Sequence, residues 1–290
     1  PPPPRGMSSA ASDVYQRQAI RNMGPAAKRD IILSCAQMAE KASLEHIWAV
    51  DHVAIPPDES EGSDGIWLDP LAVLSFFAAA TSEIKIGVSV LVLPYRPPLL
   101  TAKWVASIQE LSNERLLLGV GSGWMEAEYK VLGVEKRKRG KLTDEVLDFL
   151  RTCFNSKNDV VNLNGQDFYF RPKPKCPPVY VGGMTEAALR RVVERGEGWM
   201  PVGLDPVKIK PLAAQLKVLS ERAEKPIPKI MVLGSLPDDN SKALDDLLEC
   251  QELGVTDYIQ ASRYSRIEEF ENIVARLTEL KSQTEDSSIV

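Results

Sequence analysis

The sequence predicts an α/β fold, a TIM (β/α)8 barrel, from two observations. Short apolar runs alternate with segments of helical periodicity along the 290 residues. Seven strand–helix units are clear and an eighth is weak, and strands separated by helices pair in parallel because a parallel crossover needs an intervening element. Eight units in a chain of this length indicate a closed barrel, and a doubly wound sheet is the alternative.

The expected strands are short apolar runs, and the expected helices are the longer segments with apolar residues every three or four positions. The clear strands are residues 46–50, 84–94, 115–121, 179–183, 198–203, 229–236 and 257–262. The helices are residues 26–42, 69–81, 96–112, 125–133, 141–154, 185–196, 206–223, 241–254 and 266–281. The weak first strand falls in the strongly polar segment VYQRQAIR, residues 14–21.

Two segments depart from the alternation. Residues 159–178 contain apolar alternation on both sides of Asn164-Gly165, a turn dipeptide, and predict a hairpin-like excursion between strands four and five. Residues 1–12 begin with four prolines followed mainly by small residues, which predicts a tail outside the fold. Residues 13–290 are expected to form a single domain.

Composition restricts the classes of partner. A net charge of -5 and one dense basic run, Lys136-Arg137-Lys138-Arg139, argue against a nucleic-acid partner. No apolar run reaches the roughly 18 residues of a membrane span. Four cysteines without a C-x-x-C spacing indicate reduced thiols in a cytoplasm, and two histidines leave little material for a metal site. A small-molecule substrate is the expected partner.

Polar and small residues gather at the carboxyl ends of four consecutive expected strands, which is where the working residues of a TIM barrel lie. In strand order, these residues are Asp51-His52, Ser122-Gly123 and Gly182-Gly183-Met184, and the third strand carries Ser89-Val90 before LVLPYRPP. Taken alone, Ser89-Val90 is a routine dipeptide inside a strand. An imidazole can accept or donate a proton at neutral pH and a neighbouring carboxylate can orient it, so His52 and Asp51 are candidate catalytic residues. The alternative is a polar pair that only caps a strand. His46 precedes the strand core and is expected to be exposed and inert.

The glycines after strands four and five allow two interpretations. GVGSGW is not a dinucleotide fingerprint, because Trp124 stands where G-x-G-x-x-G needs its third glycine. In VGGMTEAALRR, Gly182 and Gly183 precede a helix, where backbone N–H groups can approach a phosphate. Tight turn geometry is the alternative. Four tryptophans near strand ends, Trp48, Trp67, Trp124 and Trp199, either pack or wall a planar ligand.

Several segments in order carry a resemblance to a known family. They are HIWAVDH, IKIGVSVLVLPYRPPLLTAKWVASIQELSNERLLLGVGSGWMEAEYKVLGV, RGKLTDEVLDFLR and PPVYVGGMTEAALRRVVERGEGWMP. Together they resemble the bacterial luciferase-like monooxygenase superfamily, most closely its branch of coenzyme F420-dependent oxidoreductases. The resemblance covers roughly residues 22–203 well and the remainder by organisation only.

The resemblance implies a TIM barrel with an excursion between strands four and five that binds FMN or the deazaflavin F420 at its carboxyl face. By the same resemblance, His52 is the acid or base and Asp51 its partner. The resemblance also implies a non-proline cis peptide behind the flavin ring, at Ser89-Val90. By the resemblance, the coenzyme phosphate is expected to meet Ser122-Gly123 and the backbone of Gly182, Gly183 and Met184. Family members are commonly homodimers.

Two departures from the family pattern affect the expectations. The family's first strand is apolar, whereas residues 14–21 are polar. Sugar-phosphate dehydrogenases of the family carry a glutamate where this chain has Trp124, which disfavours a sugar-phosphate substrate.

The leading hypothesis is an F420-dependent oxidoreductase that transfers a hydride between coenzyme and a small organic substrate. The alternatives are an FMN-dependent monooxygenase that consumes oxygen, and a non-catalytic flavin-binding protein if the first strand is missing.

Overall fold

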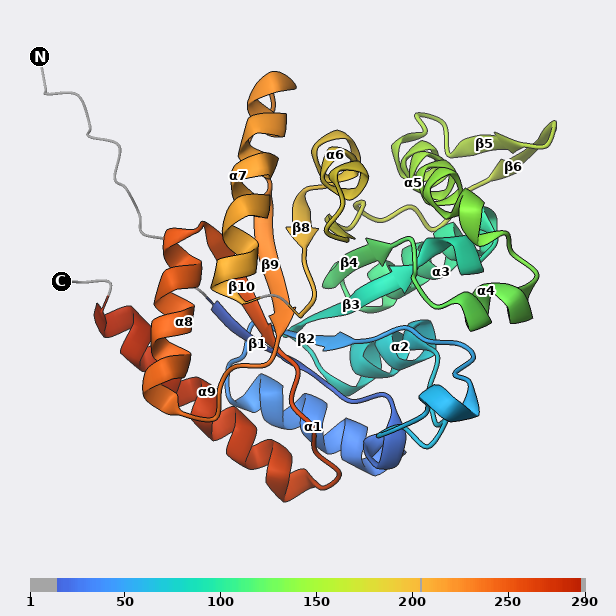
Figure 1. Ribbon diagram of the computed structural model, residues 1–290. Helices are drawn as coiled ribbons and strands as arrows, with labels where there is room; N and C mark the ends of the chain where they lie inside the picture. The colour runs from blue at the N-terminus through green and yellow to red at the C-terminus, as the bar shows by residue number, and fades with distance from the viewer. Residues whose placement is uncertain (1–14, 204, 288–290) are drawn as a thin grey trace, which may run out of the picture.

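Eight parallel strands close into a barrel that helices surround (Figure 1). The computed structural model describes residues 15–203 and 205–287, so the predicted tail, residues 1–12, lies outside the described residues. Around the barrel the order is β1-β10-β9-β8-β7-β4-β3-β2, and β2 pairs with β1 to close it. The barrel strands are β1 (Tyr15–Ala19), β2 (His46–Ala49), β3 (Lys85–Val92), β4 (Leu116–Gly121), β7 (Val179–Gly182), β8 (Gly198–Met200), β9 (Lys229–Gly234) and β10 (Val255–Gln260). The predicted TIM barrel is confirmed.

The first strand, which its polar sequence made doubtful, is formed. Gln18 of β1 lies opposite Gln260 of β10 on one side and Ile47 of β2 on the other. Ala19 contributes to the apolar interior of the barrel, and Ile20 packs outward against the helices. Pairing on both edges stabilises this strand, because strand propensity depends more on neighbours than on the residues themselves.

Nine α-helices within the described residues pack around the barrel. They are α1 (Arg29–Lys41), α2 (Pro70–Ala80), α3 (Pro98–Leu111), α4 (Glu126–Leu132), α5 (Arg139–Asn155), α6 (Glu186–Arg195), α7 (Pro206–Arg222), α8 (Asn240–Glu252) and α9 (Ile267–Ser287). Side-chain caps begin several of them: the Asp69 carboxylate accepts from the backbone N–H groups of Leu71 and Ala72, and Thr185 accepts from Ala188. Such caps satisfy N–H groups that have no partner inside the helix. All nine expected helices are present, with small shifts at their ends.

The excursion predicted between the fourth and fifth barrel strands is also present. After β4 the chain forms α4, α5 and an antiparallel hairpin of β5 (Val160–Leu163) and β6 (Gln166–Tyr169) before it returns in β7. Asn164 and Gly165 both have positive φ, 53° and 79°, as a two-residue hairpin turn requires. In Figure 1 the hairpin projects from the edge of the molecule, away from the barrel.

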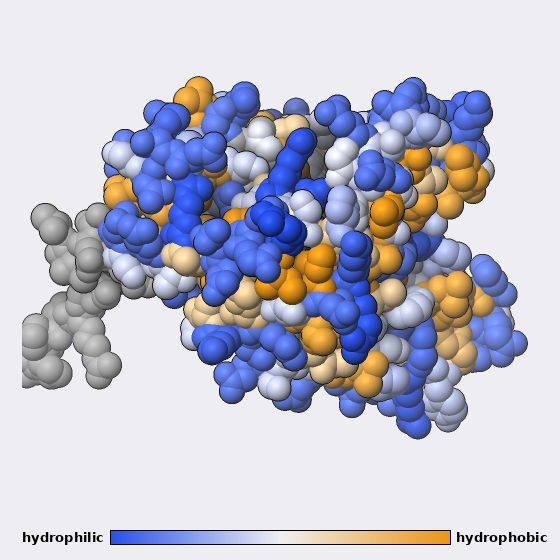
Figure 2. Space-filling model, turned by 90° about the horizontal axis from the view of Figure 1, so that it is seen from below, coloured by the Kyte–Doolittle hydropathy of each residue, from blue (hydrophilic) through white to orange (hydrophobic). Residues whose placement is uncertain are grey.

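The face of the molecule seen from below is mostly hydrophilic (Figure 2). Figure 2 shows the molecule from below the view of Figure 1, with hydrophobic residues in limited patches among hydrophilic ones. None of the helices within residues 15–203 and 205–287 combines the length and the apolar composition that a membrane crossing requires.

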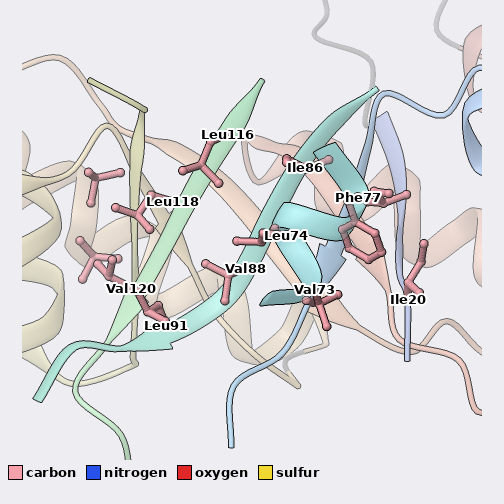
Figure 3. Packing of buried hydrophobic residues seen from close by; sticks show 14 of the residues in the cluster. Ile20, Val73, Leu74, Phe77, Ile86, Val88, Leu91, Leu116, Leu118 and Val120 are labelled. Carbon is pink, nitrogen blue, oxygen red and sulfur yellow. The ribbon is translucent and has the colours of Figure 1, made fainter. Parts of the chain in front are cut away.

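Two apolar layers hold the barrel together. In β3, alternate side chains point outward against α2, as Figure 3 shows for Ile86 and Val88 beside Leu74 and Phe77. Leu118 of β4 points outward toward α3 and α5, where it lines a small cavity with Val105 and Leu147. The side chains that point inward form the barrel interior. These residues are Ala19, Trp48, Leu117, Tyr180, Met200, Met231, Leu233 and Ile259, with Val90 and Ala261 packed against them. The interior is thus filled, and the open end of the barrel is left for the site.

Candidate active site

His52 follows β2 at the carboxyl end of the barrel, and its ring contacts a carboxylate. Nδ1 lies 3.1 Å from Oε2 of Glu128, a residue of α4. The His52 side chain is 20% exposed and that of Glu128 only 1%. The imidazole therefore stands at the surface of the barrel mouth with a buried carboxylate behind it.

Glu128 accepts four hydrogen bonds in this buried position. Oε1 accepts from the backbone N–H groups of Val53 (2.6 Å) and Ala54 (3.2 Å). Oε2 accepts from the Tyr95 hydroxyl at 2.9 Å and contacts His52. Burial raises the pKa of Glu128, but the His52 contact and the two N–H groups outweigh it and hold the pKa below its usual value. Glu128 is thus a carboxylate at neutral pH.

Asp51 points away from His52 to a different partner. Its two oxygens accept from both terminal nitrogens of Arg96, at 2.6 and 2.9 Å, and from the backbone N–H of Val92 at 2.8 Å. Arg96 also donates to Asp69, the residue that caps α2. The prediction that Asp51 orients His52 is therefore wrong. Asp51 instead links the end of β2 to β3 and, through Arg96, to Asp69 at the start of α2. The carboxylate that contacts His52 is Glu128.

The peptide bond between Ser89 and Val90 is cis, as predicted. It lies in β3 at a shift of the β3–β4 register: Val88 lies opposite Leu118, but Leu91 lies opposite Val120. Three steps along β3 therefore match two along β4, which is a β-bulge. Past the bulge, the Val90 side chain joins the residues packed on the barrel interior.

Val90 packs against two glycines, Gly121 at the end of β4 and the predicted site residue Gly182. A Cβ on Gly121 would lie 2.6 Å from Cγ2 of Val90, and one on Gly182 would lie 3.2 Å from its Cγ1. Side chains at these positions would collide with Val90 or displace it. The missing Cβ atoms let Val90 lie across β4 and β7, which gives the barrel mouth an apolar floor.

The Ser122-Gly123 turn is enclosed by tyrosine hydroxyls. Gly123 has φ +68°, and a Cβ there would lie 2.6 Å from Cγ1 of Val92 and 3.1 Å from the Tyr95 hydroxyl. The Tyr129 hydroxyl donates to the carbonyl of Ser122. Burial raises the pKa of Tyr129 to about 12, so it is a phenol that can donate. Only glycine fits here, and the turn packs against Tyr95, whose hydroxyl also donates to Glu128.

The turn after β7 presents exposed backbone. Gly183 has φ +115°, its carbonyl accepts from Nε1 of Trp199 at 2.7 Å, and Met184 beside it is exposed. Thr185 then caps α6. The Gly182, Gly183 and Met184 backbone thus lies at the start of a helix, which is a position that favours an anion.

The four tryptophans divide into two pairs. Trp48 and Trp199 are fully buried and pack, Trp48 inside the barrel and Trp199 outside it. Trp67 and Trp124 flank His52, with ring centroids 4.6 and 6.0 Å from the imidazole in edge-to-face geometry. Trp124 is 65% exposed. The second pair forms an aromatic wall at the barrel mouth.

His46 does not have the predicted exposed position. It is the first residue of β2 and is buried, with Nε2 3.0 Å from the Asp257 carboxylate of β10 and Nδ1 accepting from Nε1 of Trp48. The sequence pattern places His46 before the strand core and therefore predicts exposure. His46 is buried instead because the closed barrel brings β10 close to the start of β2, where the Asp257 carboxylate contacts its ring.

The fold and the site define an α/β-barrel enzyme with an imidazole–carboxylate pair and an open apolar floor at its carboxyl face. Residues 11–286 match the sequence model of a family described as luciferase-like monooxygenase. The chain belongs to this luciferase-like family of oxidoreductases and monooxygenases.

Three curated relatives are similar in sequence. A protein of Mycobacterium tuberculosis is 33% identical over 79% of this chain and 83% of its own length. The F420-dependent glucose-6-phosphate dehydrogenase of Amycolatopsis mediterranei is 30% identical over 80% of this chain and 72% of its own length. The FMNH2-dependent dimethylsulfone monooxygenase of Pseudomonas fluorescens is 32% identical over 42% of this chain and 35% of its own length. Relatives thus include users of both coenzymes, and the F420-dependent relative supports the predicted F420 branch.

Solved structures share the fold. The monooxygenase RslO1 of Streptomyces bottropensis superimposes with a TM-score of 0.75 at 14% identity, over 96% of this chain and 100% of that one. An F420-dependent secondary alcohol dehydrogenase superimposes with a TM-score of 0.66 at 19% identity, over 93% of this chain and 84% of that one. At these identities the likeness concerns the fold alone.

Proposed function

We propose that this protein is an F420-dependent oxidoreductase that transfers a hydride between the coenzyme and a small organic substrate. The observation that carries the proposal is the His52 imidazole at the barrel mouth, with a buried carboxylate behind it and tryptophans on two sides. The sequence likeness to an F420-dependent dehydrogenase supports the choice of coenzyme.

The residues at the barrel mouth fit a planar ring that carries a phosphate. Val90, lying across Gly121 and Gly182, offers an apolar surface that any side chain at either glycine would disturb. The exposed backbone of Gly183 and Met184 before α6 would hold the phosphate, together with the Ser122-Gly123 turn. When bound, the reduced deazaflavin supplies a hydride to the substrate and its oxidised form accepts one.

His52 moves the proton that accompanies the hydride. When the substrate is oxidised, Nε2 of His52 accepts the proton that the substrate loses with the hydride, and the Glu128 carboxylate stabilises the imidazolium that forms. When the substrate is reduced, the same imidazolium donates its Nε2 proton to the negative charge that hydride addition leaves. Trp67 and Trp124 limit the access of water to the imidazole from two sides. Glu128 holds the ring, and Asp51 with Arg96 fixes the backbone before it.

The test replaces His52 and measures turnover and binding separately. His52→Ala and His52→Asn should lower kcat for F420-coupled turnover about 10²- to 10⁴-fold, the usual contribution of a general acid or base. The Kd for F420 should change little, because the apolar floor and the phosphate turns are intact. Glu126→Gln, on the exposed side of α4, is the matched control and should behave as wild type. Undiminished turnover in both His52 variants would reject the role.

An FMN-dependent monooxygenase is the second candidate, favoured by the FMNH2-dependent relative. The same floor and phosphate turns accept either flavin, so the coenzymes are distinguished by chemistry. A hydride transfer between F420 and substrate consumes no oxygen, whereas a monooxygenase consumes one O2 for each turnover. Oxygen uptake that matches product formation would favour the FMN enzyme. The non-catalytic alternative loses its premise because β1 is formed.

We also propose that the protein is a homodimer. Leu100, Trp104 and Leu111 are exposed and lie on one face of α3, because spacings of four and seven residues return to the same side of a helix. A second copy would cover this face. Trp104→Glu should convert a dimer to a monomer in size-exclusion chromatography with light scattering, and a wild-type monomer would reject the proposal. The cytoplasmic location and the absence of a nucleic-acid partner stay predictions.

A further inference from the structure

We propose that Glu128 is a positioning residue that fixes the tautomer of His52, with the proton on Nδ1 and the lone pair of Nε2 directed to the barrel mouth. Neither the family match nor the named relatives point to this residue. The inference rests on the proposed proton transfer by His52 for its consequence in catalysis, but the tautomer itself is a property of the free protein.

The contacts of the two residues fix the direction of the hydrogen bond. A carboxylate can only accept, and hydrogen bonds with His52, Val53 and Ala54 hold Glu128 in the ionised form. The proton between Nδ1 of His52 and Oε2 of Glu128, 3.1 Å apart, therefore belongs to His52. A neutral imidazole has one N–H, so Nε2 carries the lone pair.

The remaining groups around Glu128 keep its oxygen in place. Its Oε1 is held by the backbone N–H groups of Val53 and Ala54, the two residues that follow His52. The Tyr95 hydroxyl donates to Oε2 from another direction, and burial together with the carboxylate raises the Tyr95 pKa far above its usual value. Tyr95 therefore stays a donor and cannot take the proton of His52.

The free side of the imidazole faces the mouth. Within residues 15–203 and 205–287, no hydrogen-bond partner contacts Nε2 of His52. Trp67 and Trp124 pack edge-to-face with the imidazole on two sides. This packing restricts rotation of the ring while Nδ1 is held by Glu128. One carboxylate thus sets the ring orientation, the tautomer and the backbone that follows it.

Nitrogen-15 NMR of the labelled, coenzyme-free protein tests the tautomer. The chain has only two histidines, so two sets of ring signals appear, and His52→Asn assigns them. At a pH where the ring is neutral, Nδ1 of His52 should show the shift of a protonated nitrogen and Nε2 that of a bare one. A wild-type spectrum with the proton on Nε2 would overturn the proposal without any further variant.

Variants of the contacts separate the carboxylate from its surroundings. Glu128→Gln should mix or reverse the two tautomers, because the amide can also donate, and the Nδ1 and Nε2 shifts should move toward each other. Tyr95→Phe keeps the carboxylate and should keep the wild-type tautomer, as should Glu126→Gln on the exposed side of α4. The His46 signals, from the opposite end of β2, report that each variant is folded. An unchanged His52 spectrum in folded Glu128→Gln would contradict the proposal.

The kinetic consequence is measured apart from the tautomer. In Glu128→Gln, kcat should fall on the order of a hundredfold while the KM for F420 changes little, since general acid–base catalysis contributes about that much or more. If Glu128→Gln changes the tautomer of His52 but leaves kcat and KM equal to wild type, the proposed effect of Glu128 on catalysis is rejected. If the wild-type protein turns over neither coenzyme, the proposed function fails, whereas the NMR result on Glu128 stands by itself.

Discussion

Replacement of Gly123 by alanine tests whether the turn after β4 needs glycine for its backbone, for its contacts, or for both. Gly123 has φ +68°, and its absent Cβ would lie 2.6 Å from Val92 and 3.1 Å from the Tyr95 hydroxyl. Gly133, which ends α4, has nearly the same φ of +67° but nothing within 4 Å of its absent Cβ. The two glycines therefore differ in contacts and match in backbone.

The magnitudes follow from this comparison. A left-handed conformation costs an alanine about 1–2 kcal/mol, and this cost applies to both sites. Overpacking adds about 1–3 kcal/mol only at Gly123. We expect Gly133→Ala to lower the free energy of unfolding by about 1–2 kcal/mol and Gly123→Ala by about 2–5 kcal/mol. The benefit of alanine in the unfolded chain is the same for both and cancels in the difference.

Urea unfolding followed by circular dichroism measures both changes. The midpoint should fall further for Gly123→Ala, with an unchanged m-value if the unfolded state is the same. Displacement of the Tyr95 hydroxyl should also disturb its contact with Glu128 and so reduce turnover in Gly123→Ala alone. Equal destabilisation by the two substitutions would refute the reasoning, because the contacts around Gly123 would then cost nothing.

Three further predictions concern stability and binding. Asp51→Asn leaves the Arg96 guanidinium with one carboxylate partner in place of two. The free energy of unfolding should fall by about 3 kcal/mol, near the lower end for a broken buried ion pair. An unfolding free energy equal to wild type would contradict this prediction. Trp199→Phe removes the hydrogen-bond donor to the Gly183 carbonyl, and the free energy of unfolding should fall by about 1–3 kcal/mol. The same substitution should weaken coenzyme binding in a titration. Unchanged affinity would show that this turn does not bind the phosphate. Folding lowers the pKa of Glu128. The ionised carboxylate therefore stabilises the fold fully at pH values above the unfolded-state pKa of about 4.3. This contribution is lost as the pH falls through the folded-state pKa. The stability difference between wild type and Glu128→Gln should therefore be largest at neutral pH and shrink below about pH 4; a difference independent of pH would contradict this assignment.

The barrel was predictable because periodicity is strong in most of its elements. Strands such as β4, with six buried residues, and helices such as α2, whose start is marked by Asp69 and Pro70, follow rules that act within a few residues. The exception is β1. Its polar residues carry little strand signal, and its position depends on pairing with β10, which lies some 240 residues later in the chain.

The site was predictable in its position but not in its partners. The carboxyl-end rule identified His52, and the family resemblance, not any local pattern, predicted the cis bond at Ser89-Val90. Adjacency suggested that Asp51 serves His52. Successive side chains of an extended segment point to opposite sides, so Asp51 reaches Arg96 while His52 reaches Glu128.

Glu128 was missed because its partners are about 75 residues away in sequence. One local signal was present. In α4 the buried positions include Glu128 and Tyr129, and Met125 just before the helix is buried as well, so a glutamate lies on the apolar side of a short helix. A charged residue on a buried helix face needs a partner, and the strand end that holds His52 supplies it.

The central claim is that the barrel mouth is built for the deazaflavin coenzyme. Side-by-side fluorescence titrations of the purified protein with F420 and with FMN test it most directly. Saturable binding of one F420 per chain, with a Kd at least tenfold below that for FMN, is the predicted result. Tighter binding of FMN, or no saturable binding of F420, would contradict it.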